Sequence, residues 1–383
     1  MKIAQVAPLA ESVPPKLYGG TERVVSWLTE ELVRQGHEVT LFASGDSETS
    51  ARLVPSCPHG LRLAGINDHL ATHLVMLSKV RRMASEFDII HFHVDLLQHP
   101  LFHLIDYKTI TTMHGRLDLP DNMPIYNAFP GMPVVSISDH QRLPMPSYVN
   151  WVDTIPHGLP PAMGQFSKHG GDYLAFLGRI CRDKRPDRAI EIAKRAGMPL
   201  KIAAKVDPAD TDYFEEIIKP MLDHSLIEFI GEIDDQQKGA FLGNARALLF
   251  PIDWPEPFGL VMIEAMAAGT PVIAWGNGSV PEVITEGVSG FMVSSIDEGV
   301  EAVGKSLALD RSIVRQAFEL RFTVEKMANA YVTVYQRQLA NYWPAPSSLA
   351  GSRFGAAAYA IGDHAIPARD ASGMVSVADR SLR

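Results

Sequence analysis

Short apolar segments alternate with amphipathic segments along most of the chain. The first apolar segment, residues 3–7, predicts a buried strand, and residues 21–35 place Val24, Leu28 and Leu32 on one stripe of a helix. Gly36 then ends the helix, because glycine readily takes the positive φ found at helix ends. Further apolar runs follow at residues 38–43, 88–92, 109–113 and 134–137. Strands separated by helices form parallel sheets, so the pattern predicts an α/β fold.

The alternation stops and then starts again, which predicts two domains. Residues 144–171 are rich in proline and glycine and predict a linker segment. Strand patterns then return at residues 173–177, 200–204, 227–230, 247–251 and 271–274, with helical patterns at 187–196, 238–244 and 260–268. We place the domains at residues 1–155 and 156–323, followed by a long helix at 324–343. Residues 344–383 lack apolar periodicity and predict a disordered tail.

Composition narrows the class of protein. The net charge of −9 over 383 residues argues against binding nucleic acid by bulk charge. Cys57 and Cys181 match no zinc or redox spacing, which fits a reducing compartment. No apolar run reaches the ~18 residues of a membrane span, and the N-terminus lacks the features of a signal peptide. We therefore expect a cytoplasmic protein. The basic, partly apolar stretch at residues 76–83 could lie on a membrane, but we favour an ordinary surface helix.

The richest candidate chemistry lies in residues 255–274. Pro255 and Pro257 keep Glu256 off the helix that follows, whereas Glu264 falls in the second turn of that helix. Gly259 allows a ligand close to the backbone, and the N–H groups of Gly259, Leu260 and Val261 at the helix start suit a phosphate. Ionised carboxylates accept hydrogen bonds from hydroxyl groups. A phosphate beside hydroxyl-rich groups describes a nucleotide sugar.

Two further segments predict contacts with phosphate. Arg179 and Lys184 follow a predicted strand and precede a helix, where they would converge on phosphate oxygens, with Arg182 and Arg185 as competing candidates. The Gly19-Gly20 pair before the first helix lets the backbone reach a ligand, although glycine pairs more often make turns.

Histidines and acidic residues supply weaker candidates. His114 follows a predicted strand and precedes a glycine, so it is the best candidate to bind substrate, whereas His91 looks like a core residue. The scattered histidines do not have metal-ligand spacing, and no metal site is expected. Asp210 lies before a helical segment, and we favour a helix cap there over a metal-binding role.

These motifs resemble the retaining glycosyltransferase family 4, also called glycosyl transferase group 1. The resemblance rests on the Glu-x7-Glu block of Glu256 and Glu264 in its Pro-Phe-Gly context. Supporting matches are Gly19-Gly20, Gly178-Arg179 with Lys184, residues 278–293 and residues 321–325. It covers about residues 1–342. One departure is His157-Gly158, where the family often has Asn-Gly.

The resemblance implies a GT-B fold, in which two Rossmann-like domains face a cleft. Residues 1–155 would bind the acceptor, residues 156–323 the donor, and the helix at 324–343 would return to the first domain. Arg179 and Lys184 would bind the donor diphosphate, and Glu264 the ribose hydroxyls. Phe258, Gly259, Leu260 and Val261 would also contact the donor, and Gly20 would contact its phosphate. Glu256 would contact the transferred sugar near its 3-hydroxyl, and His114 the sugar and reacting phosphate.

We therefore expect a retaining, metal-independent glycosyltransferase that uses a nucleotide-diphosphate sugar, with a UDP-sugar favoured, and an unidentified hydroxyl acceptor. It would need no cofactor, because positive side chains and helix N-termini can stabilise the leaving diphosphate. A sugar phosphorylase or nucleotide-sugar epimerase on the same fold is one alternative. A nucleotide-sugar-binding protein without turnover is another.

Overall fold

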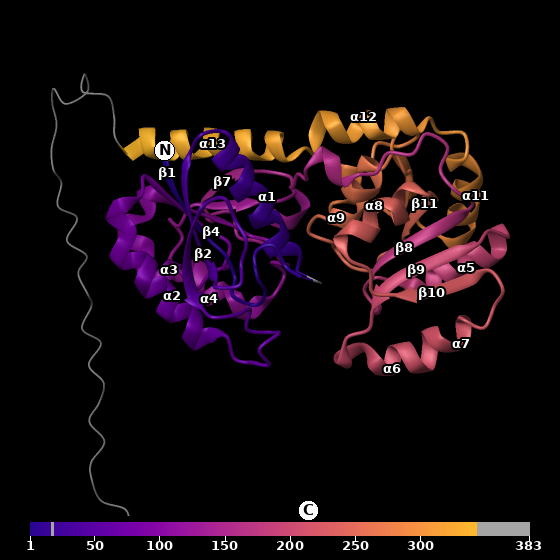
Figure 1. Ribbon diagram of the computed structural model, residues 1–383, viewed down its shortest axis with the longest axis horizontal. Coiled ribbons are helices and arrows are strands. Elements are labelled where there is room, and N and C mark those ends of the chain that lie inside the picture. Colours follow the sequence, from indigo (N-terminus) through magenta and orange to yellow (C-terminus); the bar gives the residue numbers. More distant parts are fainter. Residues whose placement is uncertain (17–18, 343–383) are drawn as a thin grey trace, which may run out of the picture. The chain divides into compact units, whose positions relative to one another are not determined.

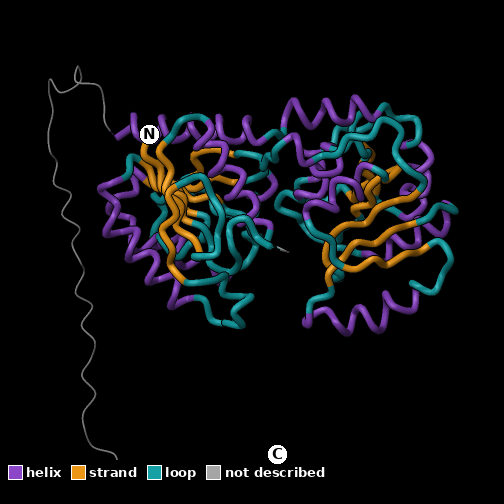
Figure 2. The backbone as a smooth tube through the Cα atoms, viewed as in Figure 1, coloured by secondary structure: helices purple, strands orange, loops and turns teal. Residues whose placement is uncertain are grey.

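The computed structural model describes residues 1–16 and 19–342, which form two parallel sheets flanked by helices (Figures 1 and 2). The tail that was expected to be disordered lies outside these residues. The N-terminal half contains β1 (Lys2–Val6), α1 (Gly20–Arg34), β2 (Glu38–Ser44), β3 (Arg52–Cys57), α2 (Leu70–Met83), β4 (Ile89–Phe92), α3 (His99–Phe102), β5 (Thr109–Thr112), α4 (Met123–Ala128), β6 (Val134–Ser136) and β7 (Trp151–Thr154).

Seven strands form the first sheet in the order β3-β2-β1-β4-β5-β6-β7, and every pairing is parallel. β1 lies inside the sheet, with Gln5 opposite Leu41 of β2 on one side and His91 of β4 on the other. Helices cover both faces, which explains why four successive residues of β1, Ile3 to Val6, are buried, with Gln5 as the one polar side chain among them. The α/β fold predicted from the sequence is confirmed.

The C-terminal half repeats this architecture with six strands in the order β10-β9-β8-β11-β12-β13. Its elements are β8 (Tyr173–Arg179), α5 (Pro186–Ala196), β9 (Leu200–Lys205), α6 (Thr211–Tyr213), α7 (Lys219–Met221), β10 (Ile227–Gly231), α8 (Asp235–Gly243), β11 (Ala245–Phe250), α9 (Leu260–Ala267), β12 (Val272–Trp275), α10 (Val280–Val283), β13 (Gly290–Val293), α11 (Ile296–Ser306), α12 (Arg311–Arg321) and α13 (Val324–Tyr342).

Two strands of the first sheet were not predicted. β3 contains Pro55, and β7 lies inside the proline-rich segment that predicted a linker. Both are edge strands, where one row of backbone groups needs no partner strand and proline is tolerated. In both strands, polar or charged residues stand beside the apolar ones, so neither sequence shows the apolar run that identifies a central strand.

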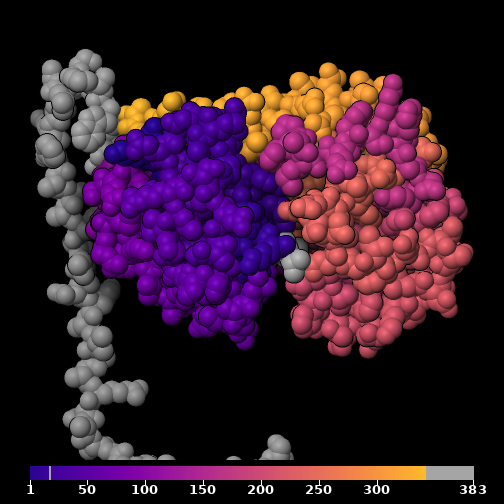
Figure 3. All heavy atoms as spheres, in the orientation of Figure 1, coloured from indigo at the N-terminus to yellow at the C-terminus, as the bar shows by residue number. Residues whose placement is uncertain are grey.

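The last helix returns to the first sheet. Tyr331 and Tyr335 of α13 are fully buried, and their hydroxyl groups bond to side chains of β1, β4 and β5. Arg337 forms an ion pair with Asp153 of β7 at 3.0 Å. Figure 3 shows α13, in yellow, lying along the N-terminal half. The chain thus crosses from one sheet to the other and back.

Direct bonds also link the two halves. The Glu282 carboxylate accepts hydrogen bonds from the backbone N–H groups of Asp139 and His140, both at 2.8 Å. Ser138 Oγ donates to the carbonyl oxygen of Pro257 at 2.6 Å, just before the start of α9. These bonds fix the loop after β6 against the loop that carries Glu256.

The helix α2 contains the stretch that could have lain on a membrane. It buries Met76, Leu77 and Val80 in the core of the first half, as expected of a surface helix. In the part of the chain that the structure describes, no helix combines the length and apolarity needed to cross a bilayer.

Candidate active site

A cavity of about 480 Å³ lies between the two halves and receives residues from both. It lies at the carboxyl ends of the strands, the usual ligand position in parallel α/β sheets. Every site residue predicted from the sequence lines it: Gly19, Gly20, His114, Arg179, Lys184, Glu256, Phe258, Gly259, Leu260, Val261 and Glu264.

Two helices begin at this cavity, one from each half. α1 follows Gly19 and α9 follows Gly259, and neither start is capped by a side chain. Gly259 has a φ of +76°, and a Cβ added there would lie 2.9 Å from the Met262 side chain, so the position favours glycine. Backbone N–H groups at an uncapped helix start attract anions. The two starts together make the cavity suitable for a phosphate-bearing ligand.

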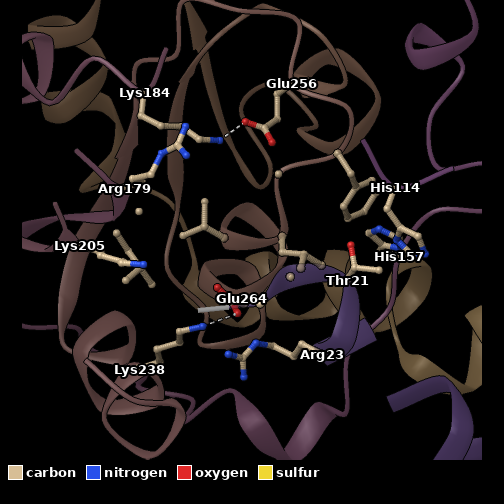
Figure 4. A pocket seen from close by; sticks show the side chains of 18 of the residues that line it. Thr21, Arg23, His114, His157, Arg179, Lys184, Lys205, Lys238, Glu256 and Glu264 are labelled. Atoms are coloured by element: carbon tan, nitrogen blue, oxygen red, sulfur yellow. Dashed lines mark hydrogen bonds and ion pairs between the residues drawn. The ribbon is translucent and has the colours of Figure 1, made fainter. Parts of the chain in front are cut away.

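Lys184 and Glu256 form an ion pair across the cavity (Figure 4). Trp254 Nε1 donates to the same Glu256 oxygen at 2.9 Å, and the Lys184 ammonium lies 5.2 Å from the centre of the Trp254 ring. The pair is partly buried, so each charge needs a partner when no ligand is present. Arg179, at the end of β8, is likewise 3.5 Å from both Asp207 and Asp210.

A second ion pair holds Glu264. Lys238 of α8 lies 3.2 Å from Glu264 Oε1 and 3.2 Å from Asp235 (Figure 4). Asp235 in turn pairs with Arg23 of α1, so this cluster joins the two halves. Both carboxylates of the Glu-x7-Glu block are therefore held by lysines. A ligand carrying phosphate and hydroxyl groups could replace both partners, since phosphate accepts from lysine and carboxylate accepts from hydroxyl.

Neutral histidines line the first-half side of the cavity. His114 stacks on His157 with 5.2 Å between ring centres (Figure 4). His114 also bonds to His93 at 2.8 Å, and His157 meets Phe258 in an edge-type ring contact. Burial lowers the pKa of His114 to about 3, and lowers the pKa of His93 and of His157 well below the ordinary value. At neutral pH, the His114 ring is therefore uncharged and can interact with a ligand through hydrogen bonds.

The competing candidates lie off the cavity lining. The Arg182 guanidinium lies over the Tyr213 ring, and Arg185 bonds to Asp187 and Asp253. Asp210 was expected to cap a helix, and this was wrong, because its side chain makes no cap bond and pairs with Arg179. His91 is a core residue as expected, with both ring nitrogens bonded to Tyr335 and Thr112.

Six charged residues on the cavity lining were not predicted from the sequence: Glu22, Arg23, Arg62, Lys205, Glu232 and Lys238. Burial raises the pKa of Glu22 and lowers that of Arg23, whose charge is supported by Glu264 and Glu22. Glu22 and Arg23 lie two and three residues after Gly20, and this closeness to the glycine pair is the sequence feature that could have identified them. Lys238 lies on a helix with no motif of its own. Within residues 1–16 and 19–342, no group of three or more His, Cys, Asp or Glu side chains is placed to hold a metal ion.

The buried histidines predict a loss of stability in mild acid. His91, His93, His114 and His157 have pKa values lowered by burial, so below about pH 6.5 the unfolded chain binds more protons than the folded one. The stability is fully present above the unfolded pKa and falls as the pH drops toward the folded values, by up to about 1.4 kcal/mol per pH unit for each histidine. Urea unfolding at pH 7.0, 6.0 and 5.5 measures this slope.

A matched pair of variants tests whether burial of the histidines causes this dependence of the free energy of unfolding on pH. His157→Gln removes one buried ring and should reduce the slope by up to one proton, whereas His59→Gln replaces a side chain that is 72% exposed and should leave it unchanged. A wild-type free energy of unfolding that stays constant from pH 7.0 to 5.5 would contradict the account.

Two family models match successive parts of the chain. The model described as "Glycosyltransferase Family 4" matches residues 18–186, and the one described as "Glycosyl transferases group 1" matches residues 164–312. Together they span residues 18–312, which include every predicted site residue and all the strands described above except β1.

Similar curated proteins include a named glycosyltransferase and a protein described as uncharacterized. A phosphatidyl-myo-inositol mannosyltransferase of Mycobacterium leprae is 24% identical over 352 residues, covering 83% of this chain and 90% of that protein. An uncharacterized 41.2 kDa protein in the cps region of Klebsiella pneumoniae is 29% identical over 169 residues, covering 43% of this chain and 46% of that protein.

Solved structures share the fold. AviGT4, a glycosyltransferase involved in avilamycin A biosynthesis, is 26% identical with a TM-score of 0.70, covering 89% of this chain and 98% of that one. HepE of Anabaena, solved in complex with UDP, is 17% identical with a TM-score of 0.65 over 88% of this chain and 100% of that one. The GT-B fold expected from the sequence is thus confirmed, and the chain belongs to the group 1 glycosyltransferases of family 4.

Proposed function

We propose that this glycosyltransferase moves a sugar from a nucleoside diphosphate sugar to a hydroxyl acceptor, with retention of anomeric configuration and without a metal ion or other cofactor. The observation that carries the proposal is the cavity in which two uncapped helix starts, two lysines and two carboxylates meet. A UDP-sugar is the first candidate donor, since the structurally similar HepE was solved with UDP.

The diphosphate would lie against the start of α9, with Arg179 and Lys184 on its oxygens and the Gly20 backbone on the opposite side. Lys184 would then leave Glu256 for the phosphate. As the bond between the anomeric carbon and the phosphate oxygen breaks, negative charge grows on the leaving diphosphate. Fixed cations and helix N–H groups already in place would stabilise that charge, the role that a metal ion performs in other transferases.

Glu256 and Glu264 would bind opposite ends of the donor. Glu264 lies on α9 beyond the phosphate position and would accept hydrogen bonds from the ribose hydroxyls once Lys238 releases it. Glu256 precedes α9 and would accept from the transferred sugar near its 3-hydroxyl, and His114 would contact the same sugar. We assign no covalent nucleophile. The acceptor hydroxyl would attack a short-lived oxocarbenium-like species from the face that the diphosphate leaves and would pass its proton to the departing diphosphate, which retains configuration.

Product stereochemistry tests the reaction type. The protein would be incubated in EDTA with a panel of UDP-, GDP-, ADP- and dTDP-sugars and candidate sugar or polyol acceptors, and the products followed by proton NMR. We expect one α-linked donor to give an α-linked product. A β-linked product would contradict retention, and transfer that needs added metal would contradict the metal-independent mechanism. A product that forms only with free phosphate would identify a phosphorylase instead.

The role of Glu264 predicts discrimination between ribose and deoxyribose. If Glu264 accepts from the 2′-hydroxyl, UDP should bind about tenfold or more tightly than 2′-deoxy-UDP, because hydrogen bonds to charged groups contribute about 1.5–3 kcal/mol. In Glu264→Gln, that ratio should fall toward one. Calorimetric titration of both nucleotides into both proteins measures it.

Glu286→Gln is a suitable control, since Glu286 is an exposed carboxylate that bonds to the Met292 backbone. It should keep the wild-type ratio. Equal binding of the two nucleotides by the wild-type protein would remove Glu264 from the ribose site, even if the nucleotide itself binds.

A further inference from the structure

A buried row of hydrogen bonds leads from the cavity to the last helix. His114 Nε2 lies 2.8 Å from His93 Nδ1, and His93 Nε2 lies 2.7 Å from Gln5 Oε1. Gln5 Nε2 donates to Tyr335 Oη of α13 at 3.2 Å. Gln5, His93 and Tyr335 lie outside the sequence motifs of the candidate site.

The strand register places these groups on one face of the first sheet. Gln5 on β1 pairs with His91 on β4, and side chains two residues apart share a face, which puts His93 beside Gln5. Thr112 on β5 and His114 beyond it follow the same alternation, and α13 covers this face. Gln5, His93 and Tyr335 are at most 2% exposed. Water therefore does not compete for these bonds.

The Gln5 amide gives the row a direction. Its nitrogen donates to Tyr335, so its oxygen must accept from a proton on His93 Nε2. A neutral His93 carries one ring proton, which leaves Nδ1 as an acceptor for a proton on His114 Nε2. Neutral His114 then has an unprotonated Nδ1.

The other branch of the row agrees with this direction. Tyr335 Oη, having accepted from Gln5, can donate to His91 Nδ1 at 2.8 Å. His91 Nε2 then donates to Thr112 Oγ1 at 2.7 Å, and Thr112 can donate to Tyr331 Oη at 2.8 Å. Each of these bonds then joins one donor to one acceptor. Exchanging the positions of Oε1 and Nε2 in the Gln5 amide would exchange donor and acceptor in every bond of the row. The proton of His114 would then lie on Nδ1.

His114 Nδ1 is buried and has no hydrogen-bond partner, on a ring that lines the cavity. A buried polar atom without a partner is costly and points to a missing ligand group. We propose that Gln5 and His93 are positioning residues that hold His114 in the tautomer with an unprotonated Nδ1, so that His114 accepts a hydrogen bond from a sugar hydroxyl. The identity of that hydroxyl rests on the proposed function, whereas the tautomer is a property of the free protein.

Nitrogen NMR of the ligand-free, full-length protein tests the tautomer directly. In protein labelled with ¹⁵N-histidine, the His114 signals are assigned by comparison with His114→Gln. We expect a protonated, pyrrole-type Nε2 and an unprotonated, pyridine-type Nδ1. The reverse pattern, or an average of the two tautomers, would overturn the proposal. Because no sugar is present, this result is independent of whether the donor is a nucleotide sugar.

Two substitutions at His93 test the positioning role. His93→Asn keeps a side-chain oxygen near the position of Nδ1, whereas His93→Leu removes every acceptor there. We expect His93→Leu to mix the His114 tautomers and lower kcat/KM about tenfold, the effect of one lost hydrogen bond, and His93→Asn to restore both. Equal activity in two variants that fold to the same extent would overturn the role of His93.

If the His93 variants do not fold, a pair of tyrosine variants tests the same proposal. Tyr335→Phe and Tyr331→Phe each remove one buried hydroxyl from α13, but Tyr335 holds Gln5 and Tyr331 does not. Tyr335→Phe should release the Gln5 amide and mix the His114 tautomers, while Tyr331→Phe keeps the wild-type NMR pattern. The same His114 spectrum in both variants would show that α13 has a structural role alone and would overturn the direction assigned to the row.

Discussion

The parallel arrangement of both sheets is the constraint on which the site depends. Parallel strands all end at the same edge, so the loops that follow them collect there. In the first half, this edge carries Gly20 after β1 and His114 after β5. In the second, it carries Arg179 at the end of β8 and Glu256 after β11. Residues far apart in sequence thereby line one cavity, together with the first turns of the helices that follow the strands.

Charge pairing allows the folded protein to keep charged side chains in this cavity when no ligand is bound. Partly buried charges are expensive unless each has a partner. Lys184 with Glu256, Lys238 with Glu264, and Arg23 with Asp235 meet this requirement. Under the proposed function the same pairs separate, because phosphate takes the lysines and hydroxyl groups take the carboxylates. In the ligand-free protein, the carboxylates thus pair with the lysines in place of the donor's phosphate, and the lysines pair with the carboxylates in place of its hydroxyl groups.

The sequence predicted the parts of the fold and site that depend on local pattern. Central strands such as β1 are mostly apolar, and Glu256, Gly259 and Glu264 lie in one continuous motif. The edge strands β3 and β7 were not predicted, because one side of each is unpaired and polar or charged residues interrupt their apolar residues. The Asp210 cap was wrong because a tertiary partner, Arg179, competes for that carboxylate.

Contacts between separate elements could not be predicted. The pairing of Arg23 with Asp235 joins α1 to α8, and it requires the two halves to meet in one particular way. The bonds from Gln5 to Tyr335 and from His93 to His114 likewise depend on strand register and on the return of α13. No spacing rule within a single segment contains that information.

Under the proposed function, the cavity binds a nucleoside diphosphate sugar by exchanging its internal ion pairs for bonds to the ligand. The most direct measurement is calorimetric titration of UDP-, GDP- and ADP-sugars, in EDTA, into the wild-type protein, Lys184→Ala and the control Lys201→Ala. Lys201 is on β9, paired with Glu228 and absent from the cavity lining. The account predicts metal-free binding of one nucleotide class, weakened at least tenfold by Lys184→Ala and unchanged by Lys201→Ala. Undetectable binding of every donor, or equal binding by both variants, would contradict it.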